Sequence, residues 1–222
     1  MFGMDKAEVE ETIRSYLLEH PELIKEVIEK YAERERLRLQ KEQKDALDAN
    51  RVALEYDPNA PVIGNPDGNV TVVEFYDYNC GYCKVMFPKI LQVVKTDGNI
   101  RWVLKDFPSL RPSSVIASLA GLAANRQGKF LEMHKALMQH RGEPTEKDIT
   151  DFAKRIGLDM DRFRSDMKSA DFETVLRNNR ILAKKIGLNG IPDIIVGDTL
   201  FAGAVSDEDL IDAVNAAREK KD

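Results

Sequence analysis

The 222-residue sequence has only two cysteines and three histidines, and its lysines and arginines form no basic stripe. Its net charge of -5 at pH 7 argues against nucleic acid as a partner. No apolar run approaches the roughly 20 residues that span a bilayer. Because 43% of the residues are apolar, the chain can bury one full core and still carry a small extension.

The start of the chain lacks the apolar core of a secretory signal, because residues 1–5 lead directly into a charged helical pattern. This fits either a cytoplasmic protein or the processed form of an exported one. No thiol lies outside the single cysteine pair, so none can mispair in an oxidising compartment. The cysteine count thus fits an oxidising compartment, as it does many cytoplasmic proteins.

Both cysteines lie in Cys80-Gly81-Tyr82-Cys83, where a strand pattern passes into a helix pattern. Residues 70–76 are β-branched and aromatic, and residues 81–94 carry apolar side chains at helical spacing. A helix N-terminus can lower a thiol pKa from about 8.5 to between about 3.5 and 7.5. We predict that Cys80 is the nucleophile and that Cys83 resolves mixed disulfides, with Gly81 and Tyr82 tuning the pair.

Three other interpretations of the two cysteines were weighed. A closed zinc site needs four ligands, and the histidines are not spaced as a ligand pair. Inert structural thiols would have no need of a helix N-terminus. Two soft thiolates suffice for Cu(I), so a Cu(I) site at Cys80 and Cys83 stays open. We expect no other metal and no cofactor.

The segment from Val73 to Lys84 resembles the active-site segment of the DsbA-like branch of the thioredoxin superfamily. Within that branch the chain is most similar to the suppressor-of-copper-sensitivity C proteins, which also carry a helical N-terminal extension. The resemblance implies a thioredoxin-like α/β fold with a helical insertion at about residues 107–187, and a periplasmic location. It extends over about residues 62–219 through Lys105-Asp106-Phe107-Pro108, Gly128-Lys129-Phe130, His134-Lys135-Ala136-Leu137, Gly190-Ile191-Pro192 and Gly203-Ala204.

Glu74 stands inside the predicted strand, six residues before Cys80. A carboxylate among apolar neighbours is costly to ionise. The resemblance implies that Glu74 is a buried acid that accepts or relays the proton of Cys83 during its attack on a mixed disulfide. The alternative is a strand residue that faces water.

Pro192 directly precedes a predicted hairpin at residues 193–202, a position where an X-Pro bond can be cis. The resemblance implies that it stands across from the cysteines and leaves the backbone of Ile191 to pair with a substrate strand. The alternative is an ordinary trans proline. Ile191 replaces the threonine usual in the DsbA-like branch, which leaves open how oxidising the pair is.

Residues 1–60 are predicted to be a helical oligomerisation stalk and linker, and residues 61–222 the DsbA-like thioredoxin domain. Helical patterns at 5–19 and from Pro21 onward carry apolar stripes that need a partner. The resemblance favours a homo-oligomer, and specifically a trimer. The alternatives are helices that fold back on their own catalytic domain and, for residues 32–54, a solvated linker helix.

Two further expectations concern the helices of the catalytic domain. His134 and His140 are expected to be exposed helical residues without a catalytic role. The last helix, from Ser206 to about Lys220, is expected to close the far face of the sheet.

These observations favour thiol-disulfide exchange by an oligomeric protein disulfide isomerase or reductase. The expected partners are unfolded or misfolded disulfide-containing proteins and a membrane thiol reductase that donates electrons. The alternatives are a monomeric dithiol oxidase and a Cu(I)-binding protein of copper tolerance that uses the same two thiolates.

Overall fold

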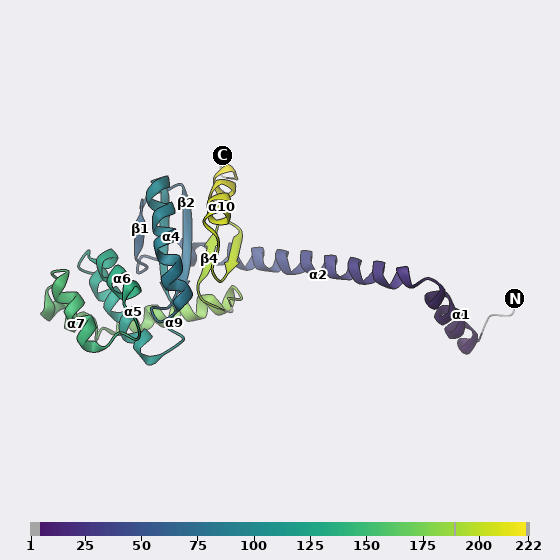
Figure 1. The fold of residues 1–222 in the computed structure, drawn as a ribbon, viewed down its shortest axis with the longest axis horizontal. Coiled ribbons are helices and arrows are strands. Elements are labelled where there is room, and N and C mark those ends of the chain that lie inside the picture. The colour runs from purple at the N-terminus through teal and green to yellow at the C-terminus, as the bar shows by residue number, and fades with distance from the viewer. Residues whose placement is uncertain (1–4, 189, 221–222) are drawn as a thin grey trace. The chain divides into compact units, whose positions relative to one another are not determined.

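The computed structural model describes residues 5–188 and 190–220, which form two compact units that meet between Asp45 and Ala46. The first unit holds α1 (Lys6–Glu19) and most of α2 (Pro21–Ala49) (Figure 1). A capping box begins α1: the Asp5 carboxylate accepts the backbone N–H of Glu8, and the Glu8 carboxylate accepts that of Asp5, each at 3.0 Å.

The first unit has an exposed apolar surface. No residue of α1 is buried, and ion pairs three or four residues apart line the exposed sides of α2. None of the helices in residues 5–188 and 190–220 is long and apolar enough to cross a membrane. The exposed large apolar side chains of this unit are Val9, Ile13, Tyr16, Leu18, Ile24, Val27, Ile28, Tyr31, Leu37 and Leu39.

The second unit is built on a sheet with strand order β1-β3-β2-β4-β5. The central pair, β2 (Val70–Tyr76) and β3 (Ile100–Asp106), is parallel. The other strands, β1 (Val62–Gly64), β4 (Asp193–Val196) and β5 (Thr199–Ala202), pair antiparallel with their neighbours. The predicted edge strand, central strand and hairpin are therefore confirmed.

A block of helices separates β3 from β4 in the sequence. It consists of α5 (Pro112–Asn125), α6 (Phe130–Gln139), α7 (Glu146–Arg155), α8 (Met160–Asp166) and α9 (Ala170–Lys185). Capping explains several boundaries, since Thr145 caps α7 through a box with Asp148 and Ser169 caps α9. The thioredoxin-like α/β fold with an inserted helical subdomain is confirmed.

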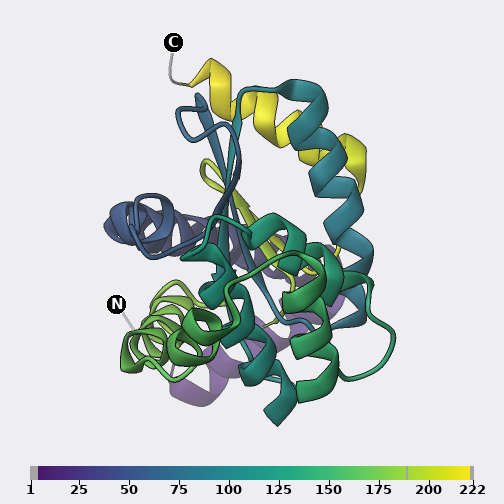
Figure 2. The same ribbon diagram turned by 90° about the vertical axis from the view of Figure 1, so that its left-hand side faces the viewer.

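Helices cover both faces of the sheet. One face packs against α4 (Gly81–Asp97) and α10 (Asp207–Glu219), which lie together in Figure 2. The opposite face packs against α9 and α3 (Arg51–Glu55). The expectation that the last helix closes the far face is wrong, because α9 and α3 already occupy that face and Leu210 and Val214 of α10 join the α4 core.

The helix expected over residues 32–54 is interrupted at Asn50, whose backbone leaves the helical region and whose amide donates to the Ala46 carbonyl at 2.8 Å. Beyond the break, the Arg51 guanidinium donates to the Gly197 carbonyl at 2.5 Å and to Asp198 at 3.0 Å. Leu47 and Leu54 are both 0% exposed in the core under the sheet. Residues 46–55 therefore belong to the second unit instead of forming a solvated linker.

Candidate active site

The two cysteines lie where β2 ends and α4 begins, as predicted. Cys80 is the N-cap of α4, with extended backbone, and its sulfur accepts the backbone N–H of Cys83 at 3.4 Å. The two thiols are not joined by a disulfide. Only 6% of Cys80 and 0% of Cys83 is exposed, so the first sulfur is the one that solvent or a substrate can reach.

The two thiols have opposite pKa shifts. A hydrogen bond from the Cys83 side chain, helped by the backbone N–H groups of Cys83 and Tyr82, lowers the pKa of Cys80 to about 6, against the opposing effects of burial and Asp77. The same sulfur-to-sulfur hydrogen bond, together with burial and the Glu74 charge, raises the pKa of Cys83 far above its ordinary value. One helix turn thus separates a stabilised thiolate from a thiol that keeps its proton.

Glu74 faces α4, because side chains alternate along β2 and its neighbours Val72 and Tyr76 pack into the core on that side. It is 0% exposed, and neither carboxylate oxygen accepts a hydrogen bond of ordinary geometry. Burial raises the pKa of Glu74 to about 8; the nearby indole N–H of Trp102 partly opposes this rise, and the Cys80 charge adds to it. The water-facing alternative is wrong.

Asp77 anchors the loop that carries Cys80, and the sequence did not single it out. One carboxylate oxygen accepts the Ser114 hydroxyl at 2.6 Å and the Asn79 N–H at 2.8 Å. The other accepts the backbone N–H groups of Ser109 and Leu110 at 2.8 and 3.0 Å. Four donors therefore hold this buried carboxylate, which fixes the loop against α5 and the chain that follows β3. An acidic residue directly after a buried strand was the available signal.

The Ile191–Pro192 peptide bond is cis, so the trans alternative is wrong. This bond lies next to the nucleophile: the Cys80 thiol donates to the Ile191 carbonyl across 3.6 Å. The Pro192 carbonyl accepts the Gly203 N–H at 2.8 Å, which ties the segment to the chain that follows β5. The structure thus brings together Ile191 and Cys80, which are 111 positions apart in the sequence.

The expectation that His134 is exposed is wrong, since 0% of it is accessible. The Tyr78 hydroxyl lies 2.9 Å from its Nδ1, and the Phe87 and Phe130 rings pack on it with centroids 4.9 and 5.1 Å away. Burial lowers the pKa of His134 to about 3, so the imidazole is neutral. The signal was its spacing: Phe130, Met133 and Leu137 share its face of α6, which is the buried one.

A second buried carboxylate, Asp106, ends β3 on the same face of the sheet. Burial raises the pKa of Asp106 to about 7, although the Ser118 and Tyr76 hydroxyls nearby lower it in part. Asp106 adds to the pKa of both Tyr76 and Tyr78, which burial already raises well above the ordinary value. Burial therefore favours the neutral forms of Glu74, Asp106 and His134 beneath the cysteines.

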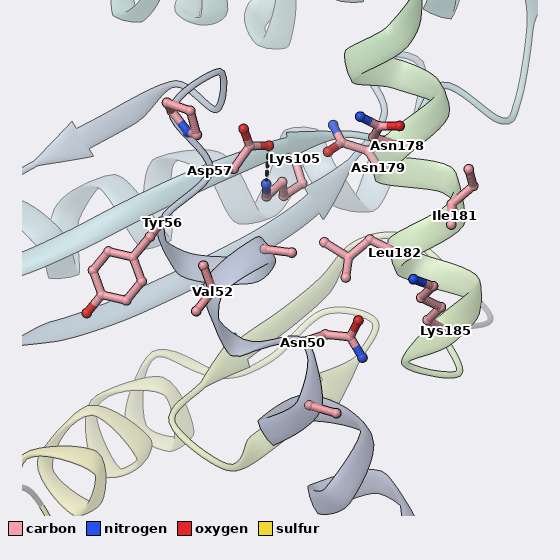
Figure 3. A pocket seen from close by; sticks show the side chains of 13 residues that line it. Asn50, Val52, Tyr56, Asp57, Lys105, Asn178, Asn179, Ile181, Leu182 and Lys185 are labelled. Carbon is pink, nitrogen blue, oxygen red and sulfur yellow. Dashed lines mark hydrogen bonds and ion pairs between the residues drawn. The ribbon is translucent and has the colours of Figure 1, made fainter.

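A cavity of about 550 Å³ lies on the other face of the second unit, between α3, β3 and α9 (Figure 3). At its wall the Lys105 ammonium donates to Asp57 at 2.7 Å. Burial lowers the pKa of Lys105. Burial acts to raise the pKa of Asp57, but hydrogen bonds from Lys105 and Asn59 bring this pKa below its ordinary value. Neither cysteine lines this cavity.

The fold and the cysteine site define a class of protein, and a family model described as thioredoxin matches residues 56–216. The chain belongs to the thioredoxin family. A second model, described as the copper resistance protein ScsC N-terminal domain, matches residues 5–36 in the first unit. The resemblance to DsbA-like proteins of the ScsC type is therefore confirmed.

Solved structures agree with this assignment. A thioredoxin-like oxidoreductase from Silicibacter pomeroyi is 42% identical, with a TM-score of 0.73 over 77% of this chain and 98% of that one. The thiol-disulfide exchange protein alpha-DsbA2 from Wolbachia pipientis is 31% identical, with a TM-score of 0.75 over 80% and 96%. A linker-deletion and N6K mutant of Proteus mirabilis ScsC is 28% identical, with a TM-score of 0.73 over 99% of each chain.

Several of the curated relatives that the chain matches are longer proteins. The Na(+)/H(+) antiporter NhaA 1 of Salinispora arenicola is 32% identical over 164 residues, which are 72% of this chain and 25% of that protein. The chain thus spans about a quarter of the length of such relatives. The sequence similarity is confined to that part of each longer protein.

Proposed function

We propose that the protein catalyses thiol-disulfide exchange on protein substrates as an oligomeric disulfide isomerase or reductase. The observation that carries this proposal is the opposed pKa shifts of the two thiols, lowered to about 6 at Cys80 and raised at Cys83. At neutral pH the Cys80 thiolate attacks one sulfur of a substrate disulfide. The other substrate sulfur leaves as a thiolate, and a mixed disulfide to Cys80 remains.

Release of the substrate follows one of two routes. A second substrate thiolate can attack the mixed disulfide, which rearranges the substrate and frees Cys80. Otherwise Cys83 attacks Cys80, for which its thiol must first lose a proton. The Glu74 charge raises the pKa of Cys83, so the two groups lie close enough to interact electrostatically. Glu74 is therefore the proposed acceptor of the Cys83 proton.

The segment at Ile191 and Pro192 is the proposed site for substrate backbone. A thiolate cannot donate a hydrogen bond, so ionisation of Cys80 frees the Ile191 carbonyl, 3.6 Å away, for a substrate N–H. Pro192 offers no competing N–H. An extended segment held by such backbone bonds binds with little regard to its side chains. Gly81 and Tyr82, both exposed on the first turn of α4, complete this surface.

Self-association of the first unit is the second part of the proposal, with a trimer favoured by the family resemblance. Its support is the exposed apolar surface of that unit and the match of residues 5–36 to the ScsC N-terminal domain. Tyr16, Val27 and Tyr31 are each more than half exposed, which is costly unless another surface covers them. Linked catalytic domains would raise the effective thiol concentration around a retained substrate, which favours isomerisation.

A dithiol oxidase is the second candidate, and one observation favours it. Lowering the pKa of Cys80 stabilises the reduced form of the pair, which makes the disulfide form a stronger oxidant. Cu(I) capture by the two thiolates also stays a prediction, for which the two sulfurs suffice. In the described part of the chain, no group of three or more His, Cys, Asp or Glu side chains could hold a metal ion.

An isomerase needs its pair kept reduced, so we infer that a membrane thiol reductase supplies electrons in a periplasmic setting. The support is the likeness to ScsC and DsbA proteins. The substrates would be unfolded or misfolded proteins that contain disulfides.

The deciding experiment is refolding of a scrambled disulfide protein, followed by its regained activity, in a glutathione buffer. We expect the wild type to restore the activity of the scrambled substrate and Cys80→Ser to restore none of it. Cys83→Ser should retain part of the isomerase activity, because substrate thiols can still release Cys80. Oxidation of a fully reduced substrate without any rescue of the scrambled one would favour the oxidase, and tight Cu(I) binding with neither activity would favour the copper-binding alternative.

A further inference from the structure

A groove with a volume of about 650 Å³ adjoins the nucleophile. Asn79 and Gly81, the residues on either side of Cys80, line it together with Lys84 of α4. Its opposite wall is Arg111, the N-cap of α5, and the end of α6 with the loop at residues 140–143. A substrate chain joined to Cys80 can therefore reach this groove.

The charges that line the groove are mainly positive. Lys84, Arg111 and Arg141 face a single lining carboxylate, Glu143. Arg111 uses its Nε to pair with Glu143 at 3.2 Å, which leaves the charges of Lys84 and Arg141 without a carboxylate partner among the described residues. Two further acids lie near the groove: Asp77 holds the active-site loop and acts on the Lys84 charge, and Asp148 completes the capping box of α7 and lies 3.8 Å from His140 Nε2.

Internal contacts hold these cations in place. The Lys84 ammonium donates to the carbonyl oxygens of His140 and Gly142, at 2.7 and 3.4 Å, and so fixes the loop that presents Arg141. Glu143 also accepts the Ser113 hydroxyl at 2.8 Å, which orients the carboxylate that holds Arg111. Burial lowers the pKa of Lys84, and the nearby Asp77 charge opposes this shift. Lys84, Arg111 and Arg141 together supply the positive charge of the groove.

We propose that this groove selects substrates whose cysteine is flanked by acidic residues, with Arg141 and Arg111 binding the substrate carboxylates. The inference rests on the proposed exchange reaction and names its substrate class. Asp or Glu close to the substrate cysteine would pair with Arg141 and compete with Glu143 for Arg111, and the attraction would speed encounter with the Cys80 thiolate. The reaction is the exchange already described, in which the Cys80–substrate S–S bond forms, the substrate disulfide breaks and its second sulfur leaves as the thiolate.

The net charge of the whole chain makes this proposal sharply testable. The chain carries -5 at pH 7, so a long-range effect alone would favour cationic peptides. A local effect of the groove favours anionic ones. The two hypotheses predict opposite orders of reactivity.

The experiment uses the full chain with Cys83→Ser, which retains the mixed disulfide. Peptides that contain one cysteine, activated as its 2-pyridyl disulfide, carry two Glu, two Gln or two Lys around that cysteine. Release of pyridine-2-thione gives the rate at pH 7. At low salt we expect the Glu peptide to react about three- to tenfold faster than the Gln peptide and the Lys peptide to be slowest, with the differences shrinking at 1 M salt.

Matched variants locate the effect. Arg141→Gln should bring the Glu-to-Lys rate ratio close to one, whereas Arg177→Gln removes the same charge from an exposed arginine of α9 and should keep the wild-type ratio. Taking the ratio within each variant cancels any change in thiolate reactivity. Equal rates for all three peptides, or a faster Lys peptide, would overturn the groove proposal. Failure to react with neutral 2,2′-dipyridyl disulfide would instead overturn the exchange reaction itself.

Discussion

Only two residues separate Cys80 from Cys83, yet their environments give the two thiols different chemistry. The Cys80 sulfur receives N–H groups at the start of α4, while Cys83 is turned into the core beside Glu74. Asp77, one unit of negative charge near the thiolate, opposes the low pKa of Cys80. Four hydrogen-bond donors nevertheless hold the Asp77 carboxylate, and these bonds position the loop that carries Cys80.

Glu74→Gln tests the proton acceptor. The pKa of Glu74 is raised to about 8 by burial, so the carboxylate form grows as pH rises toward and past that value. We expect the wild-type rate of mixed-disulfide release by Cys83 to rise through about pH 8, and the Gln variant to lose this rise and slow by about 10-fold or more. Rapid-quench measurement of the mixed disulfide between pH 6 and 9 gives this rate. An unchanged pH profile would remove Glu74 from the mechanism.

The residue scale is also where the sequence was most and least informative. The cysteine motif could be predicted because it lies in a short contiguous pattern, whereas the burial of Glu74 and the position of Pro192 were expected from the family resemblance. Asp77 and His134 carried only local signals, because their hydrogen-bond partners, and the burial of Asp106, depend on α5, α6 and β3 meeting beneath the cysteines. Lining of the groove by Arg111 and Arg141 likewise requires two loops distant in sequence to converge.

At the scale of elements, α5 packs against the active-site loop through a small residue. A Cβ added at Gly121 would lie 2.8 Å from the Tyr78 hydroxyl oxygen. That hydroxyl is 2.9 Å from His134 Nδ1 and 3.3 Å from the Tyr76 hydroxyl, so it cannot move without disturbing both. Gly121 therefore sets how closely α5 approaches the end of β2.

This contact predicts a double-mutant result. Gly121→Ala should destabilise the wild type by about 1–3 kcal/mol through overpacking. Tyr78→Phe should cost about 1–3 kcal/mol because it leaves His134 unpaired. Once the hydroxyl is absent, Gly121→Ala should be nearly neutral or stabilising, since alanine favours a helix. Urea unfolding of the four proteins measures the coupling, and strictly additive costs would contradict the contact.

Helices and strands with strong local sequence signals were predictable. Features that depend on how helices pack on the sheet were not. The β-branched run of β2, the apolar spacing of α4 and the Ser206 and Thr145 caps are readable along the chain. The break at Asn50 and the placement of α10 beside α4 were missed. Both depend on which face of the sheet already has a helix on it.

At the scale of the whole molecule, the division between Asp45 and Ala46 specifies where the chain can be shortened. A protein lacking residues 1–45 keeps Leu47 and Leu54 in the core and should unfold at the wild-type temperature. A protein lacking residues 1–56 loses both and should be less stable by about 3 kcal/mol or more. Light scattering on the first variant should report single chains where the full-length protein reports an oligomer.

The control for that truncation is a point change in the exposed apolar surface. Ile28→Glu places a charge on that surface, whereas Lys41→Glu changes an exposed, charged position of the same helix. We expect only the first to dissociate the assembly. A full-length protein that is already a single chain would contradict the stalk.

The most direct test of the central claim is titration of the Cys80 thiol in the reduced protein, by thiolate absorbance in the ultraviolet and by the rate of iodoacetamide alkylation across pH. Cys80 should titrate near pH 6 and react at pH 7 well ahead of free cysteine, and Cys80→Ser should remove the whole transition. A thiol that titrates near 9, or one that alkylates no faster than free cysteine, would contradict the account.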